Sequence, residues 1–241
     1  MYQYANRKKS GSSAGIELQF ETRSGVFYPT DTSSVLIAGC EKVLRGPSKT
    51  LDIGCGCGVV GLTLAKMGLV RAPLCASDLS AAAVELAGIN AASLGVEIDV
   101  RCGSLYEPWR EEKFELIVDD VAGISDDIAA VSGWYPEGVS CDAGRDGVRW
   151  VNQVVENAPR YLTPGGRLIF PVLSLSRMAS TLDCAKSVFS RVELVVKRDW
   201  FVPDAILKHE TLFKSLMADG AVSCEHKFGR WLWTTYIYSA S

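Results

Sequence analysis

The chain contains the stretch Thr50-Leu51-Asp52-Ile53-Gly54-Cys55-Gly56-Cys57-Gly58, in which a short apolar run leads into three alternating glycines. Residues 59–67 follow with the pattern of a helix. Glycine lets the backbone turn tightly and approach a ligand closely, because no Cβ stands in the way. The N-terminus of the next helix offers free N–H groups and the positive end of its dipole. The stretch therefore predicts a strand–loop–helix unit that binds a ligand, with a plain tight turn as the alternative.

Two acidic residues refine the kind of ligand. Asp52 precedes the glycines, and a carboxylate there suits a positively charged or hydroxyl-rich ligand better than a pyrophosphate. Asp78 ends the next apolar run, roughly 20–30 residues downstream, where a ribose-binding carboxylate belongs.

The rest of the chain alternates apolar runs with helical patterns, which predicts an α/β fold with a mostly parallel sheet and helices on both faces. We expect strands at residues 15–23, 50–53, 73–77, 97–101, 114–118, 167–172, 191–196 and 230–239. We expect helices at residues 33–44, 59–67, 80–94, 147–161, 175–189 and 204–218. A long polar loop is expected after residue 118, and an aromatic turn at residues 200–203.

The domain organisation is expected to be simple. Residues 1–14 are polar and predict a flexible tail, and residues 15–241 predict one domain. Residues 199–228 interrupt the alternation before the last strand and predict an insertion. Packing over the sheet edge is the favoured role of this insertion, and a lid over a substrate is the alternative.

Composition narrows the classes of partner. The 241 residues carry a formal net charge of −3, which disfavours a nucleic-acid partner because phosphates require a basic face. The eight cysteines are scattered and predict small free thiols rather than a metal site. No apolar run is long enough for a membrane span, and no signal peptide is evident, so we expect a cytoplasmic protein.

The glycine stretch resembles the acid-x-Gly-x-Gly-x-Gly motif of class I S-adenosylmethionine (SAM) methyltransferases, matched here by Asp52, Gly54, Gly56 and Gly58. The resemblance implies a Rossmann-like, seven-stranded sheet whose last strand is antiparallel. It also implies SAM as the cofactor, S-adenosylhomocysteine (SAH) as its product, and a methyltransferase activity.

Residues 26–196 are similar to a narrower branch, the HemK/PrmC-type N5-glutamine methyltransferases and their short relatives. Residues 26–32 resemble the Pro-x-x-Asp-Thr entry motif of that branch, one residue shorter here. The stretches 76–91, 144–147 and 162–166 also resemble the branch. The bacterial enzymes carry a helical domain ahead of the entry motif, so this chain is more similar to the short forms.

The chain departs from the branch at its acceptor motif. Asn-Pro-Pro-Tyr is replaced by residues 120–123, Asp-Val-Ala-Gly, so that Asp120 stands where the family has asparagine. An ionised carboxylate only accepts hydrogen bonds, whereas an amide also donates them. The acid expected near adenine is also replaced, by Ser104.

The resemblance implies the following roles. The cofactor is expected to contact Asp52 through its methionine portion, Asp78 and Leu79 through its ribose, and Ser104 and Leu105 through its adenine. Asp120 and Asp119 are the expected catalytic residues, with Asp120 either accepting a proton or hydrogen bond from the acceptor or merely capping its loop. The expected substrate contacts are Tyr28, Thr32 and Val121, and no metal is expected.

Three functions stay open at this point. One is methyl transfer to a nitrogen of a protein or peptide, as the overall resemblance implies. Another is methyl transfer to the nitrogen or oxygen of a small molecule, which the lost Asn-Pro-Pro-Tyr motif favours. The third is a catalytically inactive SAM-binding or scaffold protein of the same fold. The oligomeric state is unknown.

Overall fold

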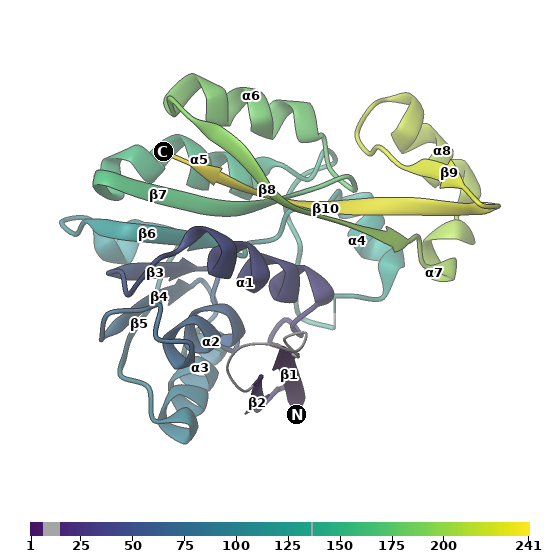
Figure 1. Ribbon diagram of the computed structural model, residues 1–241. Coiled ribbons are helices and arrows are strands. Elements are labelled where there is room, and N and C mark those ends of the chain that lie inside the picture. Colours follow the sequence, from purple (N-terminus) through teal and green to yellow (C-terminus); the bar gives the residue numbers. More distant parts are fainter. Residues whose placement is uncertain (7–14, 136) are drawn as a thin grey trace.

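The computed structural model describes residues 1–6, 15–135 and 137–241. Its centre is a sheet with the strand order β5-β4-β3-β6-β7-β10-β8 (Figure 1). The first five are parallel: β5 (Ile98–Cys102), β4 (Leu74–Asp78), β3 (Thr50–Ile53), β6 (Phe114–Asp119) and β7 (Leu162–Leu173). The last strand, β10 (Arg230–Ala240), lies antiparallel between β7 and β8 (Val192–Phe201). This arrangement confirms the predicted fold class.

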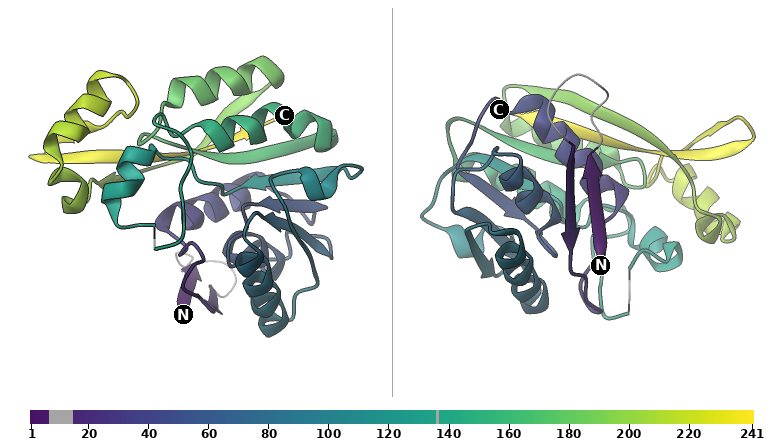
Figure 2. Two further views of the ribbon diagram at one scale, coloured as in Figure 1. Left: turned by 180° about the vertical axis from the view of Figure 1, so that it is seen from behind. Right: turned by 60° about the horizontal axis from the view of Figure 1, so that its bottom comes forward.

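Helices cover both faces of the sheet because the central strands are apolar on both sides; all four residues of β3 are buried. One face carries α1 (Asp31–Val43), α2 (Val59–Lys66) and α3 (Ala81–Leu94). The opposite face carries α5 (Arg149–Tyr161) and α6 (Met178–Val188). Figure 1 shows α1 and α6 on opposite sides of β10, and Figure 2 shows the molecule from behind. Two separate groups of buried apolar side chains fill these layers.

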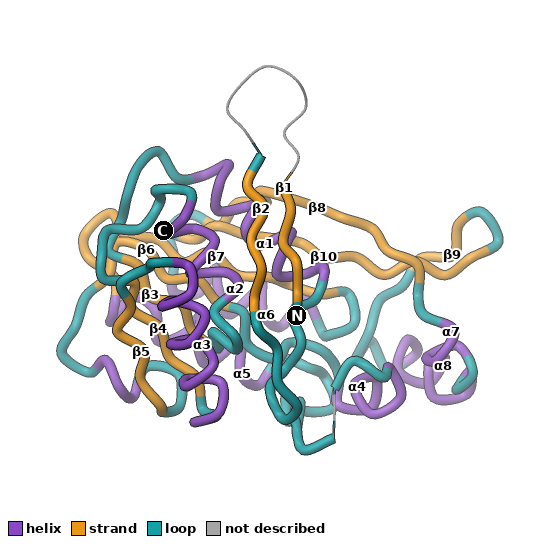
Figure 3. Tube along the Cα trace, turned by 90° about the horizontal axis from the view of Figure 1, so that it is seen from below, coloured by secondary structure: helices purple, strands orange, loops and turns teal. Residues whose placement is uncertain are grey.

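The N-terminal segment corrects one expectation. Residues Tyr2–Asn6 form β1 and pair antiparallel with β2 (Ile16–Phe20), so they are not a tail. Tyr4 and Phe20 are buried in this hairpin. Their burial stabilises a strand that the polar composition of residues 1–14 did not predict. The hairpin lies beside α1, where the Tyr2 hydroxyl hydrogen-bonds to Ser34 (Figures 2 and 3). The remainder of the expected tail, residues 7–14, lies outside the described residues.

Several element boundaries differ from those expected. Helix α1 begins at Asp31 because Thr30 takes the extended N-cap position. The loop after β6 contains α4 (Asp126–Ser132), which begins with acids in its first turn and ends at the left-handed Gly133. Strand β7 begins at Leu162, with a register shift opposite β6 that accommodates the glycines there. Helix α6 begins only at Met178, after a turn.

The segment before the last strand also differs in detail. Strand β8 continues through Phe201, so the expected aromatic turn belongs to the sheet. The expected single helix is two helices, α7 (Asp204–Leu207) and α8 (Glu210–Ala218), and β9 (Glu225–Lys227) pairs with β10. Helices α4 and α7 pack together within a third apolar cluster. This segment therefore extends the sheet at one end and supports α4 (Figure 1).

None of the helices in the described residues is long and apolar enough to cross a membrane. The eight cysteines all lie in described segments, and each is a free thiol.

Candidate active site

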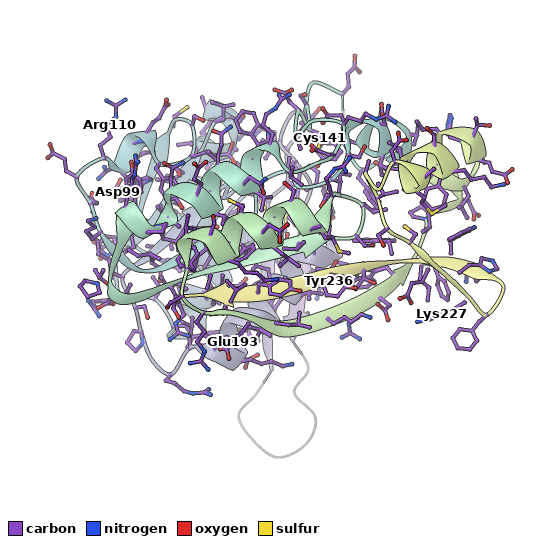
Figure 4. The ribbon with its side chains drawn as sticks, turned by 90° about the horizontal axis from the view of Figure 1, so that it is seen from above. Asp99, Arg110, Cys141, Glu193, Lys227 and Tyr236 are labelled. Carbon is purple, nitrogen blue, oxygen red and sulfur yellow. The ribbon has the colours of Figure 1, made fainter. Side chains whose placement is uncertain are left out.

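The loops after β3, β4 and β6 surround one cavity of about 480 Å³. Within the sheet, β4 and β5 lie to one side of β3, and β6 lies to its other side, so the strand order reverses at β3. Ligands of such sheets bind at the carboxyl ends of the strands where the order reverses. The cavity lies at this position, and the segment before α1 and the loop after α4 complete its walls. Its lining residue Cys141 lies far from Asp99 and Arg110, as Figure 4 shows.

The glycine loop packs directly against the loop after β6. Gly54 has a φ of 71°, a left-handed conformation that favours glycine. Its N–H donates to the carbonyl of Ser77, at 2.9 Å. A Cβ on Gly54 would lie 2.9 Å from Val121 Cγ1 and 3.1 Å from the Val121 backbone N. Gly54 and Gly56 line the cavity, whereas Gly58 lies behind it against Leu62.

Asp52 lies beneath the loop and does not line the cavity. Its side chain is fully buried, and its Oδ2 accepts the N–H of Gly61, at 2.9 Å. A Cβ on Gly61 would lie 2.8 Å from that oxygen, which explains a glycine that the sequence motif did not single out. Asp52 therefore ties the glycine loop to α2, and its expected direct contact with a cofactor stays a prediction.

Asp78 lines the cavity at the end of β4. Its Oδ2 accepts the N–H of Gly56 at 2.9 Å, and its Oδ1 accepts the N–H of Ser80 at 2.8 Å. The carboxylate is thereby aimed from β4 across the glycine loop. Leu79, the next residue, lines the same wall and is 69% exposed.

Ser104 and Leu105 also line the cavity, opposite the end of β4. Leu105 has a φ of 49°, which a leucine rarely adopts and which marks a strained position. The hydroxyl of Ser77 donates to the Leu105 carbonyl at 3.0 Å. Ser77 was not predicted as a site residue, although it holds this loop in place.

Asp120 lines the cavity directly after β6. The hydroxyl of Ser33, in the first turn of α1, donates to Asp120 Oδ2 at 2.7 Å. Burial raises the pKa of Asp120 to about 7; the hydrogen bond from Ser33 opposes this shift, and the neighbouring Asp119 adds to it. A carboxyl group with such a pKa can exchange a proton near neutral pH.

Asp119 is fully buried and does not line the cavity. Its Oδ1 accepts the N–H of Val121 at 3.1 Å, and its Oδ2 has no hydrogen-bond partner among the described residues. Burial raises the pKa of Asp119 to about 7 and that of Asp52 to about 8, and the charge of Asp52 adds to the shift at Asp119. This geometry suits a residue that shapes the loop after β6 rather than one that touches an acceptor.

These buried carboxyls predict a pH-dependent stability. Because their pKa values in the folded protein exceed the usual value near 3.9, the folded state binds more protons than the unfolded state from about pH 4 to pH 8. The ligand-free protein should therefore lose stability as pH rises through this window. Asp119→Asn should reduce the dependence of stability on pH. At pH 8 it should raise Tm by roughly 2–4 °C for each kcal/mol gained in the free energy of unfolding. Thermal unfolding of both proteins at pH 5 and pH 8 measures this, and equal slopes would refute the assignment.

The expected substrate residues separate into two groups. Thr32 and Val121 line the cavity. Tyr28 does not: it is 47% exposed, its hydroxyl donates to the Met1 carbonyl at 3.3 Å, and its ring packs on Tyr2. The adjacent Phe27 lines the cavity in its place, and its ring packs against that of Tyr135.

The sequence reasoning missed the aromatic end of the cavity. Four further aromatic residues line it: Trp134, Tyr135, Trp150 and Trp233. They come from the loop after α4, from α5 and from β10, which are far apart in the sequence. The only sequence signal was an unusual number of aromatic residues after residue 133.

The cavity suits a cationic, hydroxyl-bearing cofactor such as SAM. Within the described part of the chain, its charged lining residues are all acids: Asp31, Asp78 and Asp120. Asp52 and Asp119 each hold one unpaired oxygen in the wall behind it. A nearby positive charge would favour the ionised form of these carboxyls. Asp78 and the Leu105 loop would then hold the ribose and adenine, and the glycine loop the methionine portion.

Comparisons with known proteins agree with this geometry. Residues 17–120 match the family model described as "Methyltransferase small domain". A release factor glutamine methyltransferase of Geobacter sulfurreducens is 33% identical over 158 residues, which cover 63% of this chain and 55% of that protein. A ribosomal RNA small subunit methyltransferase C of Hamiltonella defensa is 28% identical, covering 63% of this chain and 40% of that protein. The chain thus spans about half the length of the curated relatives it matches.

Solved structures share the fold at low sequence identity. The E. cuniculi Mtq2–Trm112 complex, which is responsible for methylation of the eRF1 translation termination factor, aligns with a TM-score of 0.57 and 14% identity over 90% of this chain and 98% of that one. The T. thermophilus 16S rRNA methyltransferase RsmC, solved with AdoMet and guanosine, aligns with a TM-score of 0.58 and 14% identity over 100% of this chain and 50% of that one.

The fold is that of the class I SAM-dependent methyltransferases. Within that class the chain is similar to the release factor glutamine methyltransferases, as its sequence motifs predicted.

Proposed function

We propose that the protein transfers the methyl group of SAM to a nitrogen or oxygen atom of an acceptor bound beside Asp120. The position of Asp120 carries this proposal. Its carboxylate lines the same cavity as the glycine loop, Asp78 and a group of aromatic side chains. The shared cavity supports a proton acceptor that serves both a cofactor and an acceptor bound near the aromatic side chains.

The chain's own residues align the reactants and remove a proton. Bound SAM supplies a methyl group on a positively charged sulfur, and its transfer is an in-line displacement that depends on alignment and exclusion of water. The hydroxyl of Ser33 holds the Asp120 carboxylate in one orientation. Asp120 then takes the proton of the acceptor N–H or O–H. Asp119 keeps the backbone of Val121 in place beside Gly54.

The acceptor is proposed to be a small molecule or a protein or peptide side chain. Similarity to release factor glutamine methyltransferases supports a protein side chain. Replacement of the Asn-Pro-Pro-Tyr motif by residues 120–123 and the aromatic walls support a small molecule. A nucleic acid is disfavoured because the described lining residues include no cation to pair with phosphate. The cytoplasmic location expected from the sequence stays a prediction.

Acceptor-dependent formation of SAH tests the proposal. The purified chain would be incubated with labelled SAM and separate panels of amines, alcohols, phenols and glutamine-containing peptides. We expect SAH and a labelled product with at least one panel. Tight binding of SAM without turnover in any panel would favour the inactive SAM-binding alternative. An unchanged rate in Asp120→Ala would exclude an active role for that carboxylate.

A further inference from the structure

We propose that the acceptor is a small hydrophobic amine, which binds in its protonated form at the aromatic end of the cavity. This inference rests on the proposed methyl transfer and specifies its substrate class. It follows from the aromatic rings and the carboxylates that share one cavity.

Aromatic rings form the wall at this end, which we call the aromatic chamber: Phe27, Trp134, Tyr135, Trp150 and Trp233. The rings of Phe27 and Tyr135 lie 4.9 Å apart, and those of Trp134 and Trp233 lie 5.6 Å apart. The first pair brings the segment before α1 into contact with the loop after α4, and both segments line the cavity. Such a wall favours a compact apolar group and attracts a cation to the faces of its rings.

The charge of the cavity complements an ammonium group. Its charged lining residues, among those the structure describes, are Asp31, Asp78 and Asp120, and none is basic. Asp78 holds the glycine loop through Gly56. Asp120 is followed by residues 121–124, which also line the cavity, and Ile124 packs in the same apolar cluster as residues of the aromatic chamber. The carboxylate and the rings therefore offer a second cation a place next to the sulfonium position. Carboxylate or phosphate acceptors would be repelled there.

Other acceptor classes fit this end less well. A glutamine amide is uncharged and offers both a donor and an acceptor, but the Asp120 carboxylate can only accept when it is ionised. A phenol or alcohol would gain burial against the rings and could donate a hydrogen bond to Asp120, but it carries no positive charge for the carboxylates to attract. An amine on an apolar group gains from both. Trp233 lies in β10, outside residues 17–120 that match the family model. This wall of the chamber is therefore not part of the matched region.

The reaction balances with the groups already described. The ammonium group R–NH3⁺ gives one proton to the Asp120 carboxylate. The freed nitrogen lone pair then forms the new N–C bond while the S–CH3 bond breaks, and the sulfur keeps that electron pair. The products are R–NH2⁺–CH3 and SAH, and the proton leaves Asp120 for the solvent.

Binding of three isosteric probes tests the inference without requiring turnover. Phenethylamine, phenethyl alcohol and phenylacetate would be titrated calorimetrically into the full chain, with and without saturating SAH. We expect phenethylamine to bind at least about tenfold more tightly than phenethyl alcohol, and phenylacetate not to bind. Asp120→Asn should weaken the binding of phenethylamine and leave the affinity for phenethyl alcohol within about twofold of the wild-type value.

Variants of the chamber separate its role from simple apolar packing. Trp134→Leu keeps an apolar side chain but removes the ring. It should lower the affinity for phenethylamine by about threefold or more and lower the affinity for phenethyl alcohol by less. Trp231→Leu is the matched control, because Trp231 packs in the same apolar cluster but does not line the cavity. It should change neither affinity.

The outcomes distinguish this inference from the proposed function. If SAH binds and the alcohol binds as tightly as the amine, or none of the probes binds, the amine inference is overturned and methyl transfer stands. If SAH fails to bind the folded protein, the proposed function fails as well. Equal losses for amine and alcohol in Trp134→Leu would also contradict the inference.

Discussion

Asp120→Asn is expected to lower kcat by at least about 100-fold with any acceptor that the wild-type protein methylates, because a positioned proton acceptor contributes about 10²–10⁴-fold. The amide of asparagine cannot take the acceptor's proton, yet it has almost the same size and can still accept the hydrogen bond of Ser33. SAH affinity should change by no more than about threefold, since Asp78 holds the glycine loop whereas Asp120 accepts the hydrogen bond of Ser33 in α1. Steady-state kinetics with a parallel SAH titration measures both quantities.

Ser33→Ala provides the matched control for this prediction. It keeps the Asp120 carboxylate but removes the hydrogen bond that lowers the pKa of that group. We expect a smaller loss of kcat and a shift of the acid limb of the pH–rate profile to higher pH. If Asp120→Asn retained wild-type kcat, or if Ser33→Ala left the profile in place, Asp120 would be a loop cap and not a proton acceptor.

Gly54→Ala should both destabilise the protein and weaken cofactor binding. A left-handed alanine costs about 1–2 kcal/mol, and displacement of the Val121 backbone adds about 1–3 kcal/mol. Chemical unfolding should therefore show a loss of about 2–5 kcal/mol. Because Gly54 itself lines the cavity in the loop expected to hold the cofactor, the surviving folded protein should also bind SAH more weakly.

Gly68→Ala isolates the backbone part of this effect. Gly68 has a similar φ, 74°, but nothing lies within 4 Å of the position its Cβ would take. The Gly68→Ala variant should lose only about 1–2 kcal/mol of its free energy of unfolding and keep full SAH affinity. Equal losses in the two variants would show that the contact between the glycine loop and the loop after β6 contributes nothing.

The sequence was sufficient for the parts of the site that depend on local chemistry. The apolar runs that became β3, β4 and β6 are short, buried on both faces and bounded by turns, so their type and ends were predictable. Because parallel strands present their carboxyl ends at one edge, Asp78 and Asp120 were correctly placed at one cavity. The left-handed glycines followed from their spacing alone.

Long-range packing decided the rest, and the sequence did not reveal it. Asp52 and Asp119 turned out to be fully buried supports, because residues alternate in direction along a strand whose two faces are both covered. Phe27, rather than Tyr28, lines the cavity, and its ring packs against Tyr135 of the distant loop after α4. The aromatic chamber unites side chains from segments more than 80 residues apart, so no local pattern could predict it.

The measurement that tests the account most directly is calorimetric titration of SAH into the wild-type chain and Asp78→Ala. Asp78 is the carboxylate that joins β4 to the glycine loop at the cofactor end. We expect micromolar binding by the wild type and a loss of at least about tenfold in Asp78→Ala, the cost of about one charge-assisted hydrogen bond. Asp99→Ala is the matched control, because Asp99, on the neighbouring strand β5, pairs with Cys75 of β4 but does not line the cavity; it should bind SAH normally. Failure of the folded wild-type protein to bind SAH would contradict the account and leave the glycine stretch as a structural turn.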